Sequence, residues 1–109
     1  MKNLPHTPAQ TFAAHLLQAA QGIRAVFFDV DGILTRGELL YTEAGETIKQ
    51  FHTLDGHGLK LLQQAGIMPC IITGRDSAAL RARLAALGIT HAAYSISDKA
   101  AAAASMLHT

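Results

Sequence analysis

Apolar runs of strand length alternate along this chain with segments of helical spacing, and this alternation limits the folds open to it. Residues 23–28, 67–72 and 89–94 are short, apolar and rich in β-formers, as buried parallel strands are. Amphipathic segments fill the intervals between them. Strands and helices that alternate in this way build a parallel sheet with helices on its faces. We therefore predict an α/β fold, a Rossmann-like three-layer parallel sheet.

Four helices are expected, and each carries an end signal. The start signals are Thr7-Pro8 for the first helix, Asp55 for the second, Asp76 or Ser77 for the third and Asp98 for the fourth. The stop signals of the first three are Gly22, Gly66 and Gly88. Between the first strand and the second helix, residues 38–42 and 46–52 are strand-like and flank Glu43-Ala44-Gly45. This pattern predicts a β-hairpin inserted after the first strand.

The composition of the chain excludes some classes of function. The chain has 109 residues, half of them apolar, which suits one domain with a genuine core. Its net charge is +1 and no basic stripe occurs, so we expect no nucleic-acid partner. No run of about 18 apolar residues and no secretory leader is present, so we expect no membrane association and a cytoplasmic location. The single cysteine, Cys70, lies in an apolar run and is expected to be buried and inert.

Two carboxylates directly follow the first predicted strand, in Asp29-Val30-Asp31-Gly32. Because they lie two residues apart in extended chain, their side chains share one side. Two carboxylates so close suit a cation, and oxygen-rich sites with open positions suit Mg²⁺. One carboxylate could attack phosphorus while the other exchanges protons with the leaving group and water. The alternative is a plain turn after a strand, but the position at a strand end of an α/β chain favours phosphoryl chemistry.

The second predicted strand ends in Thr73-Gly74-Arg75, just before a helix. A hydroxyl, a glycine amide and a helix N-terminus together can bind an anion, although the same residues also suit a simple capped helix start. Lys99 occupies the first turn of the last helix, where a cation opposes the helix dipole. It either neutralises a phosphate or is an ordinary solvated lysine. His52 and His57 flank Asp55 at a spacing that matches no standard metal site, which leaves a capped helix start or a substrate-contacting loop.

The order of these motifs is similar to that of the haloacid-dehalogenase (HAD)-like phosphatases. The likeness rests on residues 29–35, on Ile72-Thr73-Gly74-Arg75 and on Lys99. Residues 45–51, 54–60 and 87–91 narrow it to the small capless branch that contains the 3-deoxy-D-manno-octulosonate 8-phosphate (KDO 8-phosphate) phosphatases. The branch acts in lipopolysaccharide precursor synthesis.

The resemblance implies roles for individual residues. It implies Asp29 as the nucleophile and Asp31 as the general acid and base, with both on Mg²⁺. It implies Thr73 and Lys99 as the groups that bind and stabilise the phosphoryl group. We assign substrate binding to residues of the three loops, namely Gly32, Gly74, Arg75, Asp55 and Gly56. It further implies a homotetramer in which the hairpin of residues 37–53 reaches a neighbour's active site and substitutes for a cap domain.

The chain also departs from the family pattern. Arg36 stands where an Asp is common, and Leu54 where an Arg often precedes Asp-Gly. Family members continue to a Gly-Asp-Asp-x-x-Asp motif that completes the magnesium site, so we expect residues 1–109 to form a single HAD-like domain truncated at its C-terminus. The alternative function is an inactive domain that acts as an oligomerisation module. A nucleotide-sugar transferase that uses Asp-x-Asp is weaker, because 109 residues leave no room for a nucleotide domain.

Overall fold

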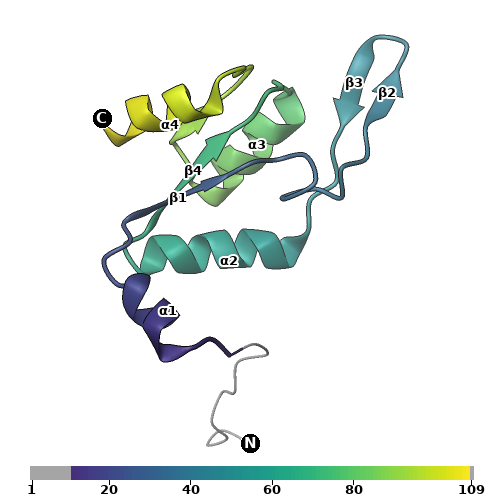
Figure 1. The fold of residues 1–109 in the computed structure, drawn as a ribbon. Helices are drawn as coiled ribbons and strands as arrows, with labels where there is room; N and C mark the ends of the chain where they lie inside the picture. The colour runs from purple at the N-terminus through teal and green to yellow at the C-terminus, as the bar shows by residue number, and fades with distance from the viewer. Residues whose placement is uncertain (1–10, 109) are drawn as a thin grey trace, which may run out of the picture.

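The computed structural model describes residues 11–108, apart from the side chains of residues 46 and 47. Its elements, in chain order, are α1 (Ala14–Ala19), β1 (Ala25–Phe28), β2 (Leu40–Thr42), β3 (Gly45–Ile48), α2 (Thr53–Gln64), β4 (Met68–Ile72), α3 (Ala78–Leu87), β5 (Ala92–Ala93) and α4 (Lys99–Leu107) (Figure 1). The predicted alternation of strands and helices is confirmed. Among the described helices, none is long and apolar enough to cross a membrane.

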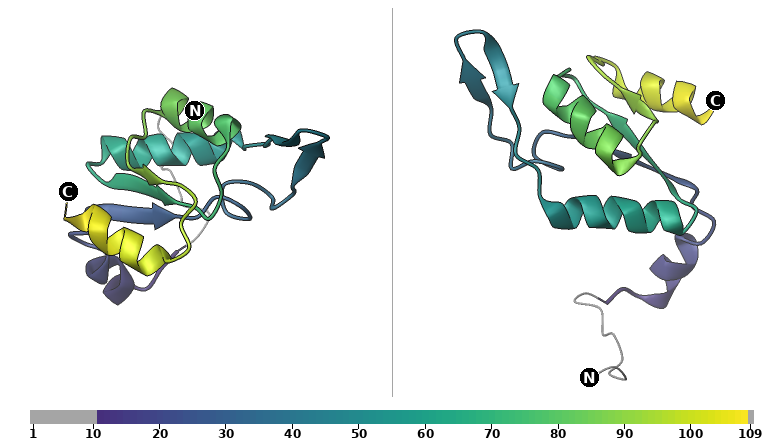
Figure 2. Two further views of the ribbon diagram at one scale, coloured as in Figure 1. Left: turned by 90° about the horizontal axis from the view of Figure 1, so that it is seen from above. Right: turned by 180° about the vertical axis from the view of Figure 1, so that it is seen from behind.

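The central sheet is parallel and has the order β1-β4-β5, while β2 and β3 form a separate antiparallel hairpin. Figure 2 shows α2 and α3 on one face of the sheet and α4 on the other, which gives three layers. The hairpin projects from the end of the sheet toward which β1 and β4 point (Figure 1). β1 is an edge strand of the described sheet, and all four of its residues are half-buried.

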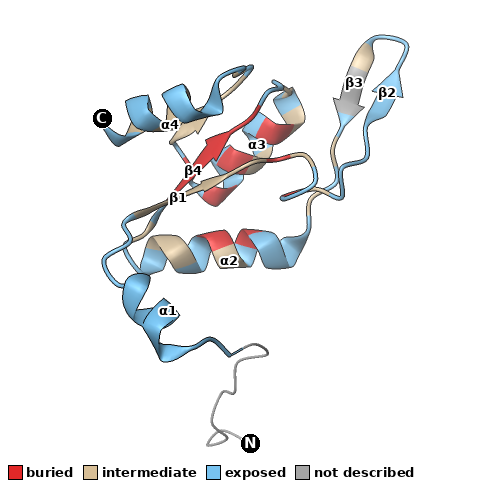
Figure 3. Ribbon diagram, viewed as in Figure 1, coloured by how far each residue is buried: buried red, intermediate tan, exposed pale blue. Residues whose placement is uncertain are grey.

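The core lies between the sheet and the layer of α2 and α3 (Figure 3). Its buried members are Val30, Leu34, Leu59, Ile71, Leu80, Leu84, Leu87 and Ile89. In contrast, α1 and α4 contain no buried residue. Cys70 is buried as predicted, and burial raises the pKa of its thiol, which keeps it in the unreactive protonated form.

The helix starts show which end signals were correct. Ser77 caps α3 through its Oγ, which accepts from the Leu80 N–H at 3.1 Å, and Asp98 caps α4 by accepting from Ala101 N–H at 3.1 Å. The assignment of Asp55 as a cap is wrong. The cap is His52, whose Nδ1 accepts from the Leu54 N–H at 3.0 Å, so α2 begins three residues earlier than predicted. Thr7-Pro8 lies outside the described residues.

Three elements are shorter than their apolar patterns. α1 spans only Ala14–Ala19, and the Ile23 N–H bonds Ala20 O at 3.3 Å, so β1 begins only at Ala25. The strand predicted over 89–94 is reduced to β5, because the Ile89 N–H bonds Leu84 O at 2.9 Å and closes α3. The backbone groups of Ile23 and Ile89 thus serve helix ends instead of strands. Ile89 is buried in the core, whereas Ile23 is 47% exposed.

Candidate active site

Asp29 directly follows β1, and both of its carboxylate oxygens have a partner. Its Oδ1 accepts from the Val30 N–H at 2.7 Å, and Lys99 Nζ lies 3.0 Å from its Oδ2. Burial raises the pKa of Asp29, but the hydrogen bonds from Lys99 and Val30 and the charge of Lys99 outweigh it, so the pKa lies below its ordinary value. The side chain is 40% exposed. Asp29 is therefore an ionised carboxylate that a ligand can reach.

The loop after Asp29 is built around one buried residue. Val30 is fully buried, and its carbonyl oxygen accepts from the N–H groups of residues 33, 34 and 35 at 2.8–3.1 Å. Thr35 Oγ1 accepts from the N–H groups of Gly32 and Gly37 at 3.3 and 3.1 Å. Gly32 has a φ of +86°, which only glycine adopts without strain. These bonds fix the backbone on either side of Asp31.

Asp31 lies between two cations. Lys49 Nζ is 2.8 Å from its Oδ1, and Arg75 Nε is 3.6 Å from its Oδ2. Arg75 also donates from Nη1 to the Tyr41 hydroxyl at 3.2 Å. Tyr41 belongs to β2, and Lys49 directly follows β3. The hairpin of this chain therefore contacts the chain's own carboxylate loop.

Thr73 and Gly74 directly follow β4. Thr73 is 1% exposed. Its N–H donates to Ala93 O in β5 at 3.0 Å, and its carbonyl accepts from the Ile96 N–H, in the loop after β5, at 2.9 Å. Thr73 Oγ1 accepts from the Arg75 N–H at 3.2 Å. The structure thus ties Thr73 and Arg75 into the loop that faces Asp31.

Charged side chains of both signs group at this loop. Lys99 pairs with Asp29, while Lys49 and Arg75 contact Asp31. Arg75 and Lys99 are 45% and 48% exposed, so their charges are open to a ligand. A cluster of this kind suits a phosphate group.

Whether the site suits Mg²⁺ can be judged from its donors. Asp29 and Asp31 provide the carboxylate oxygens that Mg²⁺ prefers. However, no group of three or more His, Cys, Asp or Glu side chains that could hold a metal occurs among residues 11–108 outside the undescribed positions. These two carboxylates therefore fit as part of a magnesium site, to which further donors would have to be added.

Two of the assigned substrate-binding residues lie outside this cluster. Asp55 is exposed on the first turn of α2, where it lines a cavity of about 290 Å³ together with Thr35, Arg36 and His52. Gly56 is buried, and a Cβ there would meet the Arg83 guanidinium and come within 3.2 Å of Leu87 Cδ2. The structure gives Gly56 a packing role between α2 and α3, and its contact with substrate stays a prediction.

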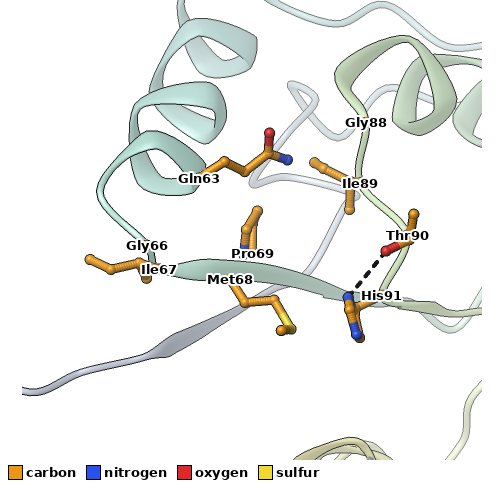
Figure 4. Close-up of a pocket in the computed structure, with 9 residues that line it drawn as sticks. All are labelled: Gln63, Gly66, Ile67, Met68, Pro69, Gly88, Ile89, Thr90 and His91. Carbon is orange, nitrogen blue, oxygen red and sulfur yellow. Dashed lines mark hydrogen bonds between the residues drawn. The ribbon is translucent and has the colours of Figure 1, made fainter.

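A second cavity, of about 310 Å³, lies at the other end of the sheet, beside the start of β4 (Figure 4). Thr90 Oγ1 and His91 Nδ1 lie 3.3 Å apart at its wall, and Gln63 donates to Leu87 O at 3.4 Å. No carboxylate lines it. It has no part in the chemistry of the aspartates.

Known proteins share both the sequence and the fold of this chain. No protein-family model matches it. The 3-deoxy-D-manno-octulosonate 8-phosphate phosphatase of Haemophilus influenzae is 50% identical over 72 residues, which cover 66% of this chain and 40% of that protein. The enzyme of the same name from Yersinia pestis is 38% identical over 97 residues, 89% of this chain and 52% of that protein.

A solved structure extends the likeness to three dimensions. It is the KDO 8-phosphate phosphatase of Moraxella catarrhalis in complex with a magnesium ion, a phosphate ion and KDO. It has a TM-score of 0.81 and 39% identity, and the match covers 86% of this chain and 54% of that one. The chain resembles the KDO 8-phosphate phosphatases of the HAD superfamily. It spans about half the length of the curated relatives it matches.

The structure brings Lys99 to Asp29 and Arg75 to Asp31, and Thr73 Oγ1 accepts from the Arg75 N–H. The roles of these residues in catalysis and binding stay predictions. Sequence reasoning missed Lys49 and Tyr41. Lys49 lies within residues 45–51, which carry part of the resemblance, but nothing in that segment marks the lysine as a partner of Asp31. Tyr41 lies in none of the motifs on which the resemblance rests. Only the way the hairpin folds back onto the loop after β1 shows their contacts.

Proposed function

We propose that this chain carries the nucleophile and phosphoryl-binding groups of a magnesium-dependent phosphatase that hydrolyses KDO 8-phosphate to KDO and phosphate, in lipopolysaccharide precursor synthesis. The observation that carries the proposal is the ionised, 40% exposed Asp29 held by the half-exposed Lys99, two residues from Asp31, which contacts the half-exposed Arg75. The named relatives supply the substrate class.

Asp29 acts as the nucleophile. Its ionised Oδ attacks phosphorus, the bond between phosphorus and the sugar oxygen breaks, and an aspartyl-phosphate forms. The two groups that hold its oxygens, the Val30 N–H and Lys99, fix the carboxylate and favour its charged form.

Asp31 acts as the general acid and base. It gives a proton to the departing sugar oxygen, and then takes one from the water that attacks the aspartyl-phosphate. The second attack releases phosphate and returns Asp29 as a carboxylate. Asp31 is well placed for both steps because it lies on the same strand-end loop, two residues from the nucleophile.

The remaining groups bind the substrate. Thr73, Gly74, Arg75 and Gly32 are proposed to surround the phosphoryl group, while Lys99 offsets the charge that develops on it. Asp55 and Gly56 are proposed to face the sugar acid from the start of α2. Mg²⁺ would be held by Asp29 and Asp31 with donors from outside the described residues, and would neutralise phosphate charge when bound.

The assembly is proposed to be a cytoplasmic, capless homotetramer formed through the hairpin of residues 37–53. The support is that Leu40, Tyr41 and Ile48 of this hairpin are 43–60% exposed. The same exposed side chains favour the second candidate function, an inactive oligomerisation module.

Phosphate release decides between the two functions. The purified chain should release phosphate from KDO 8-phosphate when Mg²⁺ is added, and Asp29→Asn should lower kcat by about 10³-fold or more. Asp76→Asn makes the same change in an exposed carboxylate that pairs with Arg81, and it should leave the rate unchanged. Release by the wild-type chain no faster than by Asp29→Asn would refute the catalytic function and favour the oligomerisation module.

A further inference from the structure

The side chain of Lys49 is shielded from water, although the residue as a whole is half-buried. Its side chain is 2% exposed, and its Nζ lies 2.8 Å from Asp31 Oδ1. Lysine is almost never fully buried unless its charge is paired. The contact with Asp31 therefore accounts for a lysine side chain that is closed off from water between β3 and α2.

The contacts of Asp31 differ in strength. Lys49 lies at hydrogen-bond distance and is shielded from water, whereas Arg75 lies 3.6 Å away and is 45% exposed. Short, desolvated ionic contacts are strong, and long, solvated ones contribute little. Of these two cations, Lys49 is the one that fixes the orientation of the Asp31 carboxylate.

Lys49 does not face the ligand. Arg75 and Lys99 are about half exposed and can meet a phosphate, but the Lys49 side chain is closed off from solvent. Lys49 can therefore act on the reaction through Asp31, the carboxylate that its Nζ contacts.

We propose that Lys49 is a positioning residue that holds Asp31 toward the leaving oxygen, so that proton donation depends on the hairpin being seated on the loop after β1. The inference rests on the proposed function of Asp31. A misplaced acid slows the release of a poor leaving group, while an activated leaving group departs with little help. The effect of losing Lys49 on kcat is thus expected to depend on the leaving group.

The test compares Lys49→Met with wild type on KDO 8-phosphate, an alkyl ester, and on p-nitrophenyl phosphate. We expect kcat for the alkyl ester to fall at least tenfold more than kcat for p-nitrophenyl phosphate, with KM little changed. Lys49→Arg should restore part of the difference. Lys60→Met, the same change at an exposed lysine of α2, should affect neither substrate. Equal losses on both substrates, or no loss, would overturn the proposal.

A second measurement keeps the inference separate from the proposed function. If the wild-type chain releases no phosphate, the proposed function fails, and thermal unfolding of Lys49→Met, Asp31→Asn and the double variant then tests the pair alone. Lys49 holds Asp31 if the double variant unfolds at about the temperature of the less stable single variant. Additive losses would overturn the positioning role.

Discussion

Charged side chains from separate parts of the chain meet where the parallel strands end. Asp29 and Asp31 follow β1, Arg75 follows β4, and Lys99 opens α4. Each carboxylate has a cation within 3.0 Å, so neither carries its charge alone. The charge of Lys99 and its hydrogen bond help to hold the pKa of Asp29 below its ordinary value.

The Asp29–Lys99 pair makes a prediction about pH. Because the pKa of Asp29 is lowered in the folded chain, the pair stabilises the fold at pH values above the ordinary carboxyl pKa, and this stabilisation is lost as pH falls through the lowered pKa. Lys99→Met removes the hydrogen bond and the charge that lower the pKa of Asp29, while the burial that raises this pKa remains. We expect the pKa of Asp29 to rise in this variant.

Carboxyl ¹³C NMR titration of the metal-free chain would measure this shift. Lys60→Met is the control, since Lys60 is exposed and lies in α2. An Asp29 pKa that is equal in wild type and Lys99→Met would contradict the contact that the structure shows.

At the scale of elements, two glycines of α2 occupy opposite environments. Gly56 faces α3, where a Cβ would meet Arg83 and Leu87, while a Cβ at Gly58 would meet nothing within 4 Å. Glycine costs a helix about 1 kcal/mol relative to alanine, so the two sites share the same gain from substitution and differ only in packing.

Gly58→Ala should therefore stabilise the chain by about 0.5–1 kcal/mol. Gly56→Ala should gain less stability than Gly58→Ala, because Leu87 Cδ2, 3.2 Å from the added Cβ, would have to give way. Urea unfolding measures both. Equal effects of the two alanine substitutions would show that α2 and α3 do not pack as described.

The limits of sequence reasoning are also clearest in particular elements. The parallel strands could be predicted because apolar periodicity is a local pattern. The helix caps at Ser77 and Asp98 could be predicted because capping depends on the residue type at the helix start. The His52 cap was not, because Asp55 is the better capping residue by type and only the path of the hairpin decides which residue precedes the helix. The contact between Lys49 and Asp31 spans 18 residues and two elements, so no local pattern encodes it.

For the whole molecule, the apolar surface of the hairpin makes a prediction about assembly. Ile48 is 56% exposed at the end of β3 and is not one of the buried core residues. If the chain self-associates through this hairpin, as proposed, burying Ile48 supplies part of the driving force, and a charge there would have to be desolvated. Ile48→Lys should therefore convert the tetramer to smaller species in light scattering coupled to size-exclusion chromatography.

The matched control is Leu61→Lys, which places the same charge at a 50% exposed apolar position on α2. We expect this variant to keep the wild-type mass. A wild-type chain that elutes as a monomer would refute the assembly directly. If Leu61→Lys dissociates the tetramer and Ile48→Lys does not, the interface lies on the helical layer, and the hairpin serves its own chain through the contact between Lys49 and Asp31 rather than a neighbour's active site.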